Sequence, residues 1–292
     1  MKKFLLFLFK LLGLLLILLI LLDLAFTQVY LNDNKRNKIN SIYNSEPKNF
    51  DVIFLGSSRA NNHFIPSIFE KAGIKSYNYG ISGSHLFETA LMLELMLERD
   101  YKIKNVIIQI DLNIGGDQKP SPKYTAQFLP FIHHSKTISN YLSSETDFNA
   151  WYYIPFYRYI EYGAVIGLRE CWATFTEKPS SVLLNGGYYP LKKKGAKMKN
   201  NLTGLKVKRN ASYEKIKALC QKNNIHLIAI TTPICENTKN REYFEEVTKV
   251  YPEIKRYDTA VQDDRYFATC GHMNVEGATT LTNKILKDFF GK

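Results

Sequence analysis

The sequence lacks the patterns that mark several common classes of protein. None of its cysteines, Cys171, Cys220, Cys235 and Cys270, forms a Cys-x-x-Cys pair, which argues against structural zinc or thioredoxin-like chemistry. It contains no Gly-x-Gly-x-x-Gly motif and no Walker loop, so nothing indicates a bound nucleotide. Histidines and carboxylates nowhere have the spacing of a metal site. We therefore expect neither a metal nor a cofactor.

Motifs for nucleic-acid binding are also missing, although the chain is basic. It has 39 lysines and arginines against 27 acidic residues, a net charge of +12. No aromatic-basic RNA motif, zinc-finger spacing or zipper heptad accompanies this charge, so nucleic acid is not an expected partner. The excess suits anionic lipid or an anionic polymer of the cell envelope. A lysine-rich soluble surface is the alternative.

The N-terminus carries a long hydrophobic run. Residues 4–22 are apolar except for Lys10. As a helix with a rise of 1.5 Å per residue, this run is about 28 Å long, close to the thickness of a hydrocarbon core. Lys2 and Lys3 favour a cytoplasmic N-terminus. A cleaved signal peptide is the rival interpretation, but the run is long for one and no small-x-small site lies near residues 24–26. We predict an uncleaved single-pass anchor in the cell membrane.

The remaining chain alternates between two kinds of pattern. Residues 1–30 form the predicted anchor and the polar residues 31–50 a linker. Residues 51–292 alternate short apolar runs with amphipathic helical patterns, which predicts an α/β domain with a three-layer parallel sheet. An aromatic-rich stretch at about 117–205 interrupts the rhythm and is predicted to be a partly helical insertion. Its aromatic residues belong to a core or, as the alternative, offer platforms for a sugar or an acyl chain.

Small and polar residues follow the predicted strands, which span 52–55, 76–79, 106–110, 227–232 and 254–257. Ser57 and Ser58 come after the first strand, Gly80 after the second and Asn113 after the third. His272 lies in the loop before the last helix. Because the carboxyl ends of parallel strands meet at one edge of a sheet, we expect these residues to lie together. They supply a nucleophile, a glycine whose backbone can approach closely, an amide donor and a base, which are the parts needed for acyl transfer to serine.

Four blocks around these residues resemble those of the SGNH/GDSL hydrolase superfamily. In the first, Ser58 takes the nucleophile position and Ser57 stands where Asp is usual. The resemblance covers about residues 51–116 and 225–290, and it implies a flavodoxin-like layering of the sheet. The blocks are Gly56-Ser57-Ser58, Asn78-Tyr-Gly80-Ile-Ser-Gly83, Ile110-Asp111-Leu-Asn113 and His272-Met-Asn274-Val-Glu-Gly277-Ala278.

The resemblance also implies roles for individual residues. His272 would deprotonate Ser58, which would attack an ester carbonyl and form an acyl-enzyme. The backbone N–H groups of Ser58 and Gly80, with the Asn113 side chain, would form the oxyanion hole.

One departure from the pattern affects the histidine. The family usually has Asp three residues before it, where this chain has Thr269. In a Ser-His-Asp triad that acid orients the imidazole, and its replacement can cost about 10⁴ in rate. A backbone carbonyl or a carboxylate such as Asp263 or Asp264 would have to take over this role.

Two further residues follow the predicted nucleophile. Arg59 and His63 could contact an anionic substrate, and we expect them to be solvated loop residues otherwise.

The resemblance implies an extracytoplasmic function. Similar membrane-anchored proteins act in O-acylation of envelope polysaccharides. We therefore expect a serine esterase or O-acyltransferase that acts on acyl, chiefly acetyl, esters of an extracytoplasmic glycan or on a small acyl ester. The alternative is a non-catalytic SGNH-like envelope protein that supports a membrane-bound acyltransferase, and the missing Asp favours it. A lipase or thioesterase is a third interpretation.

The cysteines fit an extracytoplasmic location. Cys235 follows the fourth predicted strand, and Cys270 lies two residues before His272. We expect a disulfide between them that stiffens the histidine loop. Cys220 lies on the apolar face of a predicted helix and is expected to be a buried thiol.

Overall fold

The computed structural model describes residues 1–112, 114–115 and 120–292. The chain forms two compact units. The first consists of Met1–Ser45 and Pro122–Pro179, and the second of Glu46–Ser121 and Ser180–Lys292. The expected insertion at about 117–205 is thus divided between the two units.

The second unit is built on a parallel sheet of four strands. They are β1 (Asn49–Leu55), β2 (Ser76–Asn78), β3 (Lys102–Gln109) and β5 (His226–Ile230), in the order β2-β1-β3-β5. Val52 of β1 pairs with Ser76 on one side and with Asn105 on the other. Four of the five predicted strands are therefore confirmed. The fifth, predicted over 254–257, is reduced to a single parallel bridge between Ile230 and Lys255.

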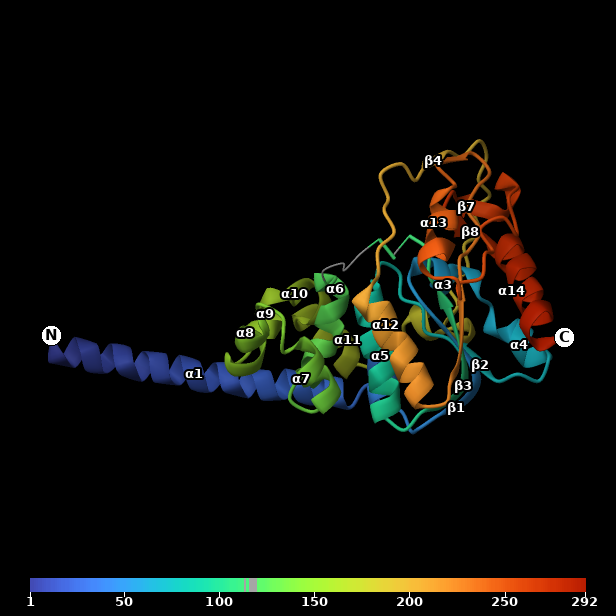
Figure 1. Ribbon diagram of the computed structural model, residues 1–292. Helices are drawn as coiled ribbons and strands as arrows, with labels where there is room; N and C mark the ends of the chain where they lie inside the picture. The colour runs from blue at the N-terminus through green and yellow to red at the C-terminus, as the bar shows by residue number, and fades with distance from the viewer. Residues whose placement is uncertain (113, 116–119) are drawn as a thin grey trace. The chain divides into compact units, whose positions relative to one another are not determined.

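Helices cover both faces of this sheet (Figure 1). One face carries α5 (Leu86–Glu98) and α12 (Ala211–Lys222), which pack against each other. The other carries α3 (Ser58–His63), α4 (Pro66–Lys71) and α14 (Val275–Phe290). Side chains alternate along a strand, so each strand serves both faces. The continuous apolar runs of β1 and β3 are what a sheet buried on both sides requires.

The core on the α14 side is a single apolar cluster. Phe54 and Ile107 of the sheet belong to it, together with Phe69 of α4 and Leu281 and Ile285 of α14. The remaining elements of this unit lie around the sheet. They are η2 (Ser181–Leu183), η3 (Asn185–Gly187), β4 (Asn200–Asn201), β6 (Thr238–Lys239), α13 (Tyr243–Val250), η4 (Asp264–Tyr266), β7 (Phe267–Thr269) and β8 (His272–Met273).

The first unit is helical and contains the apolar N-terminal segment. Helix α1 (Lys2–Leu31) is long and apolar enough to span a membrane or to act as a signal anchor. Residues 31–50, expected to be a linker, contain a helix whose N-terminus is capped by Asn37. The helices that follow α1 in this unit are α2 (Lys38–Asn44), α6 (Pro122–Thr125), η1 (Ala126–Phe131), α7 (Lys136–Leu142), α8 (Phe148–Tyr153), α9 (Tyr157–Glu161), α10 (Gly163–Ile166) and α11 (Leu168–Phe175).

The last third of α1 is part of the interior of the first unit. Asp23 Oδ1 lies 2.8 Å from the Arg158 guanidinium, which is 1% exposed. Arg158 also donates to the Thr27 hydroxyl at 3.0 Å. The Tyr30 hydroxyl donates to the Ile166 carbonyl at 3.0 Å. Residues 23–31 are therefore tied to the unit by buried polar contacts as well as by apolar packing.

Replacing Arg158 alone should destabilise the first unit strongly. Arg158→Met leaves Asp23 without its charged partner, and breaking such a pair costs about 3–5 kcal/mol. We expect a clear fall in the melting temperature of the full-length protein, measured by circular dichroism in detergent micelles. The matched control is the double variant Asp23→Leu with Arg158→Met, which should lose much less because no charge is left unpaired. Equal melting temperatures for Arg158→Met and the wild-type protein would contradict the role assigned to this pair.

Candidate active site

The candidate site lies where the order of the sheet changes direction. Strand β1 has β2 on one side and β3 on the other, and ligands in open α/β sheets bind outside the carboxyl ends of strands at such a point. After β1 the chain turns at Gly56, whose φ is +132°, and enters α3 at Ser58. A Cβ on Gly56 would lie 2.9 Å from Gln109 Oε1, so this tight turn requires glycine.

Ser58 and His272 meet at this edge. His272 Nε2 lies 2.8 Å from Ser58 Oγ, and its other ring nitrogen, Nδ1, lies 3.1 Å from Thr269 Oγ1. The antiparallel pair β7 and β8 brings Thr269 and His272 opposite each other. If Ser58 donates to Nε2, the proton of the neutral ring is on Nδ1 and points to the threonine hydroxyl. The His272 ring therefore contacts Ser58 through one nitrogen and Thr269 through the other.

The two carboxylates considered as substitutes for the usual Asp are engaged elsewhere. Asp264 Oδ2 accepts the Met198 N–H at 2.9 Å. Asp263 Oδ1 accepts the Arg265 N–H at 2.9 Å and caps a short helix. Thr269 therefore contacts the His272 ring at Nδ1, a position that neither carboxylate is seen to occupy.

The environment keeps His272 neutral. Burial lowers its pKa below the ordinary value of 6.5, and the charge of the nearby Arg59 guanidinium lowers it further. The Asp111 carboxylate opposes both effects. Because the net direction is downward, His272 is unprotonated at pH 7 and available as a base.

Arg59 is buried, which corrects the expectation of a solvated loop residue. Its side chain is 4% exposed and lies 2.9 Å from Asp111 Oδ2, and Asp111 is fully buried. The guanidinium also donates to the carbonyls of Thr232 and Pro233, both at 2.6 Å. Asp111 accepts the Thr232 hydroxyl at 2.9 Å. This one cation joins the start of α3 to the segments that follow β3 and β5.

Ser57 belongs to the same buried network. Its backbone N–H and its hydroxyl both donate to Gln109 Oε1, at 3.0 and 2.9 Å. The Gln109 amide in turn donates to Asp111 Oδ1 at 2.5 Å. The side chain of Ser57 therefore fastens the turn to β3, while Ser58 contacts the histidine. Sequence reasoning gave no role to Gln109 or Asp111, although two polar residues within a buried apolar run signal paired groups.

His63 is also buried and holds the histidine loop, which again corrects the expectation of a solvated residue. The ring is inaccessible to solvent, and its Nε2 accepts the Met273 N–H at 3.0 Å. The Gly271 backbone lies against the same ring. The side chain thus touches the backbone on both sides of His272. Helix α3 begins with Ser58 and ends with His63, so one short helix sets the position of both members of the Ser58–His272 pair.

Gly80 has a packing role that explains why a glycine is needed. A Cβ there would lie 2.6 Å from the backbone nitrogen of Asn61 in α3. Its N–H donates to Asn78 Oδ1 at 2.9 Å, so this predicted oxyanion donor already has an acceptor. The third predicted donor, Asn113, lies outside the described residues. The N–H of Ser58 is in the first turn of α3, where helices leave N–H groups without intrahelical partners.

The predicted disulfide is present. Cys235 and Cys270 are bonded, and the Cys235 N–H donates to the Cys270 carbonyl at 3.1 Å. The bond ties the segment after β5 to the turn between β7 and β8, which carries His272. Cys220 is a buried free thiol, as expected.

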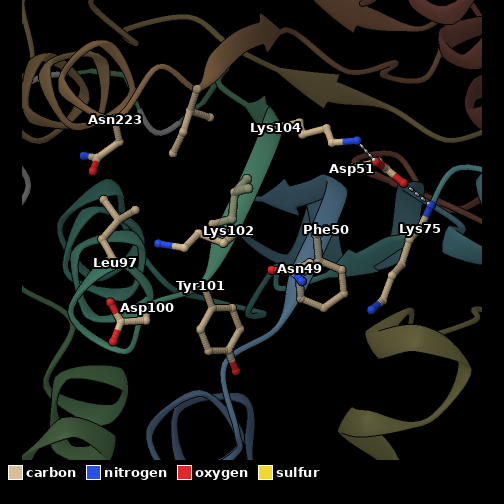
Figure 2. Close-up of a pocket in the computed structure, with 12 residues that line it drawn as sticks. Asn49, Phe50, Asp51, Lys75, Leu97, Asp100, Tyr101, Lys102, Lys104 and Asn223 are labelled. Carbon is tan, nitrogen blue, oxygen red and sulfur yellow. Dashed lines mark hydrogen bonds and ion pairs between the residues drawn. The ribbon is translucent and has the colours of Figure 1, made fainter.

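A hollow lies far from this chemistry. It has a volume of about 650 Å³ and is lined by residues at the amino ends of β1 and β3, among them Asn49, Asp51, Lys102 and Lys104 (Figure 2). This is the opposite end of the strands from Ser58. Within the part of the chain that the structure describes, no three His, Cys, Asp or Glu side chains gather as a metal site.

Comparisons with known proteins do not assign this chain to a family. The sequence matches no protein-family model and no curated protein. A solved structure of a Streptococcus pneumonia protein, provisionally called a platelet activating factor, aligns with 96% of this chain and 96% of that chain. The sequence identity is 16% and the TM-score is 0.31. A TM-score this low does not establish a shared fold, so the assignment of function rests on the site itself.

The burial of His63 should make the protein sensitive to acid. Burial and the Arg59 charge hold its pKa well below 6.5 in the folded state, whereas unfolded histidine titrates near 6.5. Below pH 6.5 the unfolded chain therefore binds the extra proton, and stability falls by about 1.4 kcal/mol per pH unit for this one group. Above pH 6.5 both states are neutral and the contribution is constant.

Denaturant unfolding between pH 5 and 7.5 measures this effect. His63→Gln keeps an acceptor for the Met273 N–H but cannot titrate. Below pH 6.5, the slope of its free energy of unfolding against pH should be smaller than that of the wild type by the equivalent of one bound proton, about 1.4 kcal/mol per pH unit. Parallel pH profiles for the variant and the wild type would show that His63 does not carry the acid sensitivity.

Proposed function

We propose that the protein is a serine esterase or O-acyltransferase of the SGNH/GDSL type that acts on acyl esters of an extracytoplasmic glycan. The observation that carries this proposal is the 2.8 Å contact between Ser58 Oγ and His272 Nε2, with Thr269 at the other ring nitrogen. A serine, a base and a group that orients the base are the minimum for an acyl-enzyme mechanism. The strand order β2-β1-β3-β5 supports the flavodoxin-like layering that this family implies.

The proposed reaction has two half-reactions. Ser58 Oγ attacks the ester carbonyl while His272 Nε2 takes the hydroxyl proton, which gives a tetrahedral oxyanion. The intermediate collapses, His272 passes the proton to the departing alkoxide, and the acyl group stays on Ser58. Water or a sugar hydroxyl then attacks the acyl-enzyme, with His272 again acting first as base and then as acid. Water gives hydrolysis, and a sugar hydroxyl gives acyl transfer.

The oxyanion needs donors at the end of β1. The Ser58 N–H in the first turn of α3 is the first, and Asn113 is the proposed side-chain donor. Gly80 can contribute only by releasing Asn78 Oδ1. Gly83, an exposed glycine with a φ of +87°, is an alternative on the same loop. This loop is held next to the turn before Ser58 because the Ile81 N–H donates to the Gly56 carbonyl at 3.0 Å.

The proposed location is outside the cytoplasm, with α1 as a single-pass anchor and the N-terminus inside. The Cys235–Cys270 disulfide supports it, since disulfides persist in oxidising compartments. The net charge of +12 suits an anionic envelope polymer. A membrane-bound acyltransferase is the proposed partner if the acyl group has to be delivered to the site. A non-catalytic supporting protein remains the second candidate, because Thr269 replaces the usual acid.

A fluorophosphonate probe distinguishes the two candidates. The wild-type protein should be labelled covalently. Ser58→Ala should lose labelling by at least about 10³-fold, because the nucleophile is gone. The control is Ser57→Ala, which removes the adjacent hydroxyl and should still be labelled, since Ser57 Oγ is bonded to Gln109. A wild-type protein that does not react, or a Ser58→Ala variant that reacts equally well, would favour the non-catalytic candidate.

Thr269 should contribute less to the rate of labelling than an acid at the same position would. Thr269→Val keeps the shape but removes the hydroxyl that His272 Nδ1 contacts. Replacing the Asp of a triad by its amide costs about 10⁴, so losing this weaker, neutral partner should slow labelling by about 10- to 100-fold. Stopped labelling time courses of the two proteins measure this ratio. Thr269→Ser serves as the control that keeps the hydroxyl and should stay close to wild type. Equal rates for all three proteins would remove Thr269 from the mechanism.

A further inference from the structure

The first unit exposes large apolar side chains within one short stretch. Six of them lie within residues 153–175, and we call this set the apolar collar. Soluble monomeric proteins rarely gather exposed apolar groups in this way, and such patches mark surfaces that bind a protein or a membrane. The apolar collar consists of Tyr153, Ile154, Ile160, Leu168, Trp172 and Phe175, which are between 50% and 74% exposed.

Helix α11 shows that the exposure follows a pattern. Leu168, Trp172 and Phe175 are spaced by four and three residues, so they form one stripe along the helix. All three point to solvent, whereas Cys171 and Thr174 face the interior of the unit. The helix is amphipathic, but its larger apolar stripe faces outward. Helices of this kind lie in the interface of a membrane with the stripe buried among the lipids.

Three members of the apolar collar lie beside the end of the predicted span. Tyr153 and Ile154 line a hollow together with Ile20 and Leu24 of α1. Phe175 lines another hollow that Ala25, Gln28 and Val29 of α1 also line. The collar therefore meets α1 at residues 20–29, directly where the apolar run 4–22 ends.

The collar lies at the boundary between the hydrocarbon core and the headgroup layer. The seven residue steps from Leu22 to Val29 rise about 10 Å, at 1.5 Å each. The polar layer on each side of a hydrocarbon core is about 5–8 Å thick. With Leu22 at the boundary of the hydrocarbon core, Ile20 lies in the upper acyl region, Leu24 and Ala25 lie in the headgroup layer, and Gln28 and Val29 lie at its outer edge. Aromatic residues such as Trp and Tyr are enriched at this depth.

The stretch that carries the collar supplies no net charge. Residues 122–179 have equal numbers of basic and acidic side chains, so the stretch is neutral. Burial of apolar and aromatic surface is the proposed driving force, and salt does not screen it as it screens charges. The basic residues are Lys123, Lys136, Arg158, Arg169 and Lys178, and the acidic ones are Glu145, Asp147, Glu161, Glu170 and Glu177.

We infer that the apolar collar is a second membrane attachment, seated in the interface of the same bilayer that α1 enters. Its occupant is the headgroup and upper acyl region of the lipid, bound through apolar and aromatic contacts. The collar holds the first unit against the membrane at the point where α1 leaves it. This inference rests on the proposed span of α1 and does not depend on the chemistry at Ser58.

The two tryptophans of the chain offer a direct test. Trp172 is in the collar and 63% exposed, whereas Trp151 is 4% exposed. The full-length protein is reconstituted in phosphatidylcholine vesicles with and without brominated acyl chains. In Trp151→Phe, which keeps Trp172, brominated lipid should quench more than about half of the emission, since the stripe of an interfacial helix sits at the acyl boundary. In Trp172→Phe, which keeps Trp151, quenching should be small. Added salt should change neither result.

Two outcomes would overturn the inference. Trp172 could be quenched by aqueous iodide and not by brominated lipid, which would place the collar in water. It could also be shielded from both quenchers while cross-linking traps dimers, which would make a second copy of the chain the occupant. If Trp151→Phe disturbs the fold, the difference in emission between the wild type and Trp172→Phe reports on Trp172 without any change at the buried position.

Discussion

The buried ion pair between Arg59 and Asp111 is the interaction on which the candidate site depends. The pair joins the start of α3 to the segment after β3, and the carbonyls that follow β5 complete the contacts of the guanidinium. The carboxyl ends of three strands are thereby fixed to one cation. A buried pair of this kind adds little net stability over apolar packing, because both ions lose their hydration. Its value is geometric, since each charge can be satisfied only when all three segments are in place.

The same cation sets the electrostatics of both histidines. Its charge adds to burial in lowering the pKa of His272 and of His63. A carboxylate at position 269 would act in the opposite direction and stabilise a charged imidazole. Thr269 is neutral, so the site favours a neutral His272 that can accept a proton at pH 7. The cost falls on the later state, in which His272 carries the proton and only Asp111 offsets the repulsion from Arg59. Compared with a site that has a carboxylate at position 269, this site keeps the base available at pH 7 but stabilises the protonated histidine less in the transition state.

The sequence predicted the meeting of Ser58 and His272 on two separate grounds. Strand ends in a parallel sheet share one edge, which placed Ser58 at the site. His272 lies in the antiparallel pair β7 and β8, and its place beside Ser58 came from the resemblance of its block to the SGNH/GDSL superfamily. The same reasoning failed for Arg59 and His63, because a turn after Gly56-Ser57 suggested a solvated loop. The structure instead starts α3 at Ser58, and residues 59 and 63, one helical turn apart, both point inward. A spacing of four residues was the available signal.

Other features depended on contacts that no local pattern reveals. The fifth predicted strand had suitable residues, but the chain gives it only one bridge to β5. The engagement of the Gly80 N–H by Asn78 follows from how the loop after β2 closes, which propensities do not encode. Asn37 caps a helix in a segment whose composition suggested only a linker. Local rules place elements, while their polar partners depend on the assembled fold.

Asp23 illustrates how tertiary contacts change the meaning of a residue in α1. In the sequence it interrupts a hydrophobic run, and a charge inside a membrane is costly. In the structure it pairs with Arg158 within the first unit, so it marks the end of the apolar run. Thr27 and Tyr30 continue this inward-facing side of α1 and are buried. Residues 23–31 of α1 therefore belong to the interior of the first unit, beyond the apolar run 4–22.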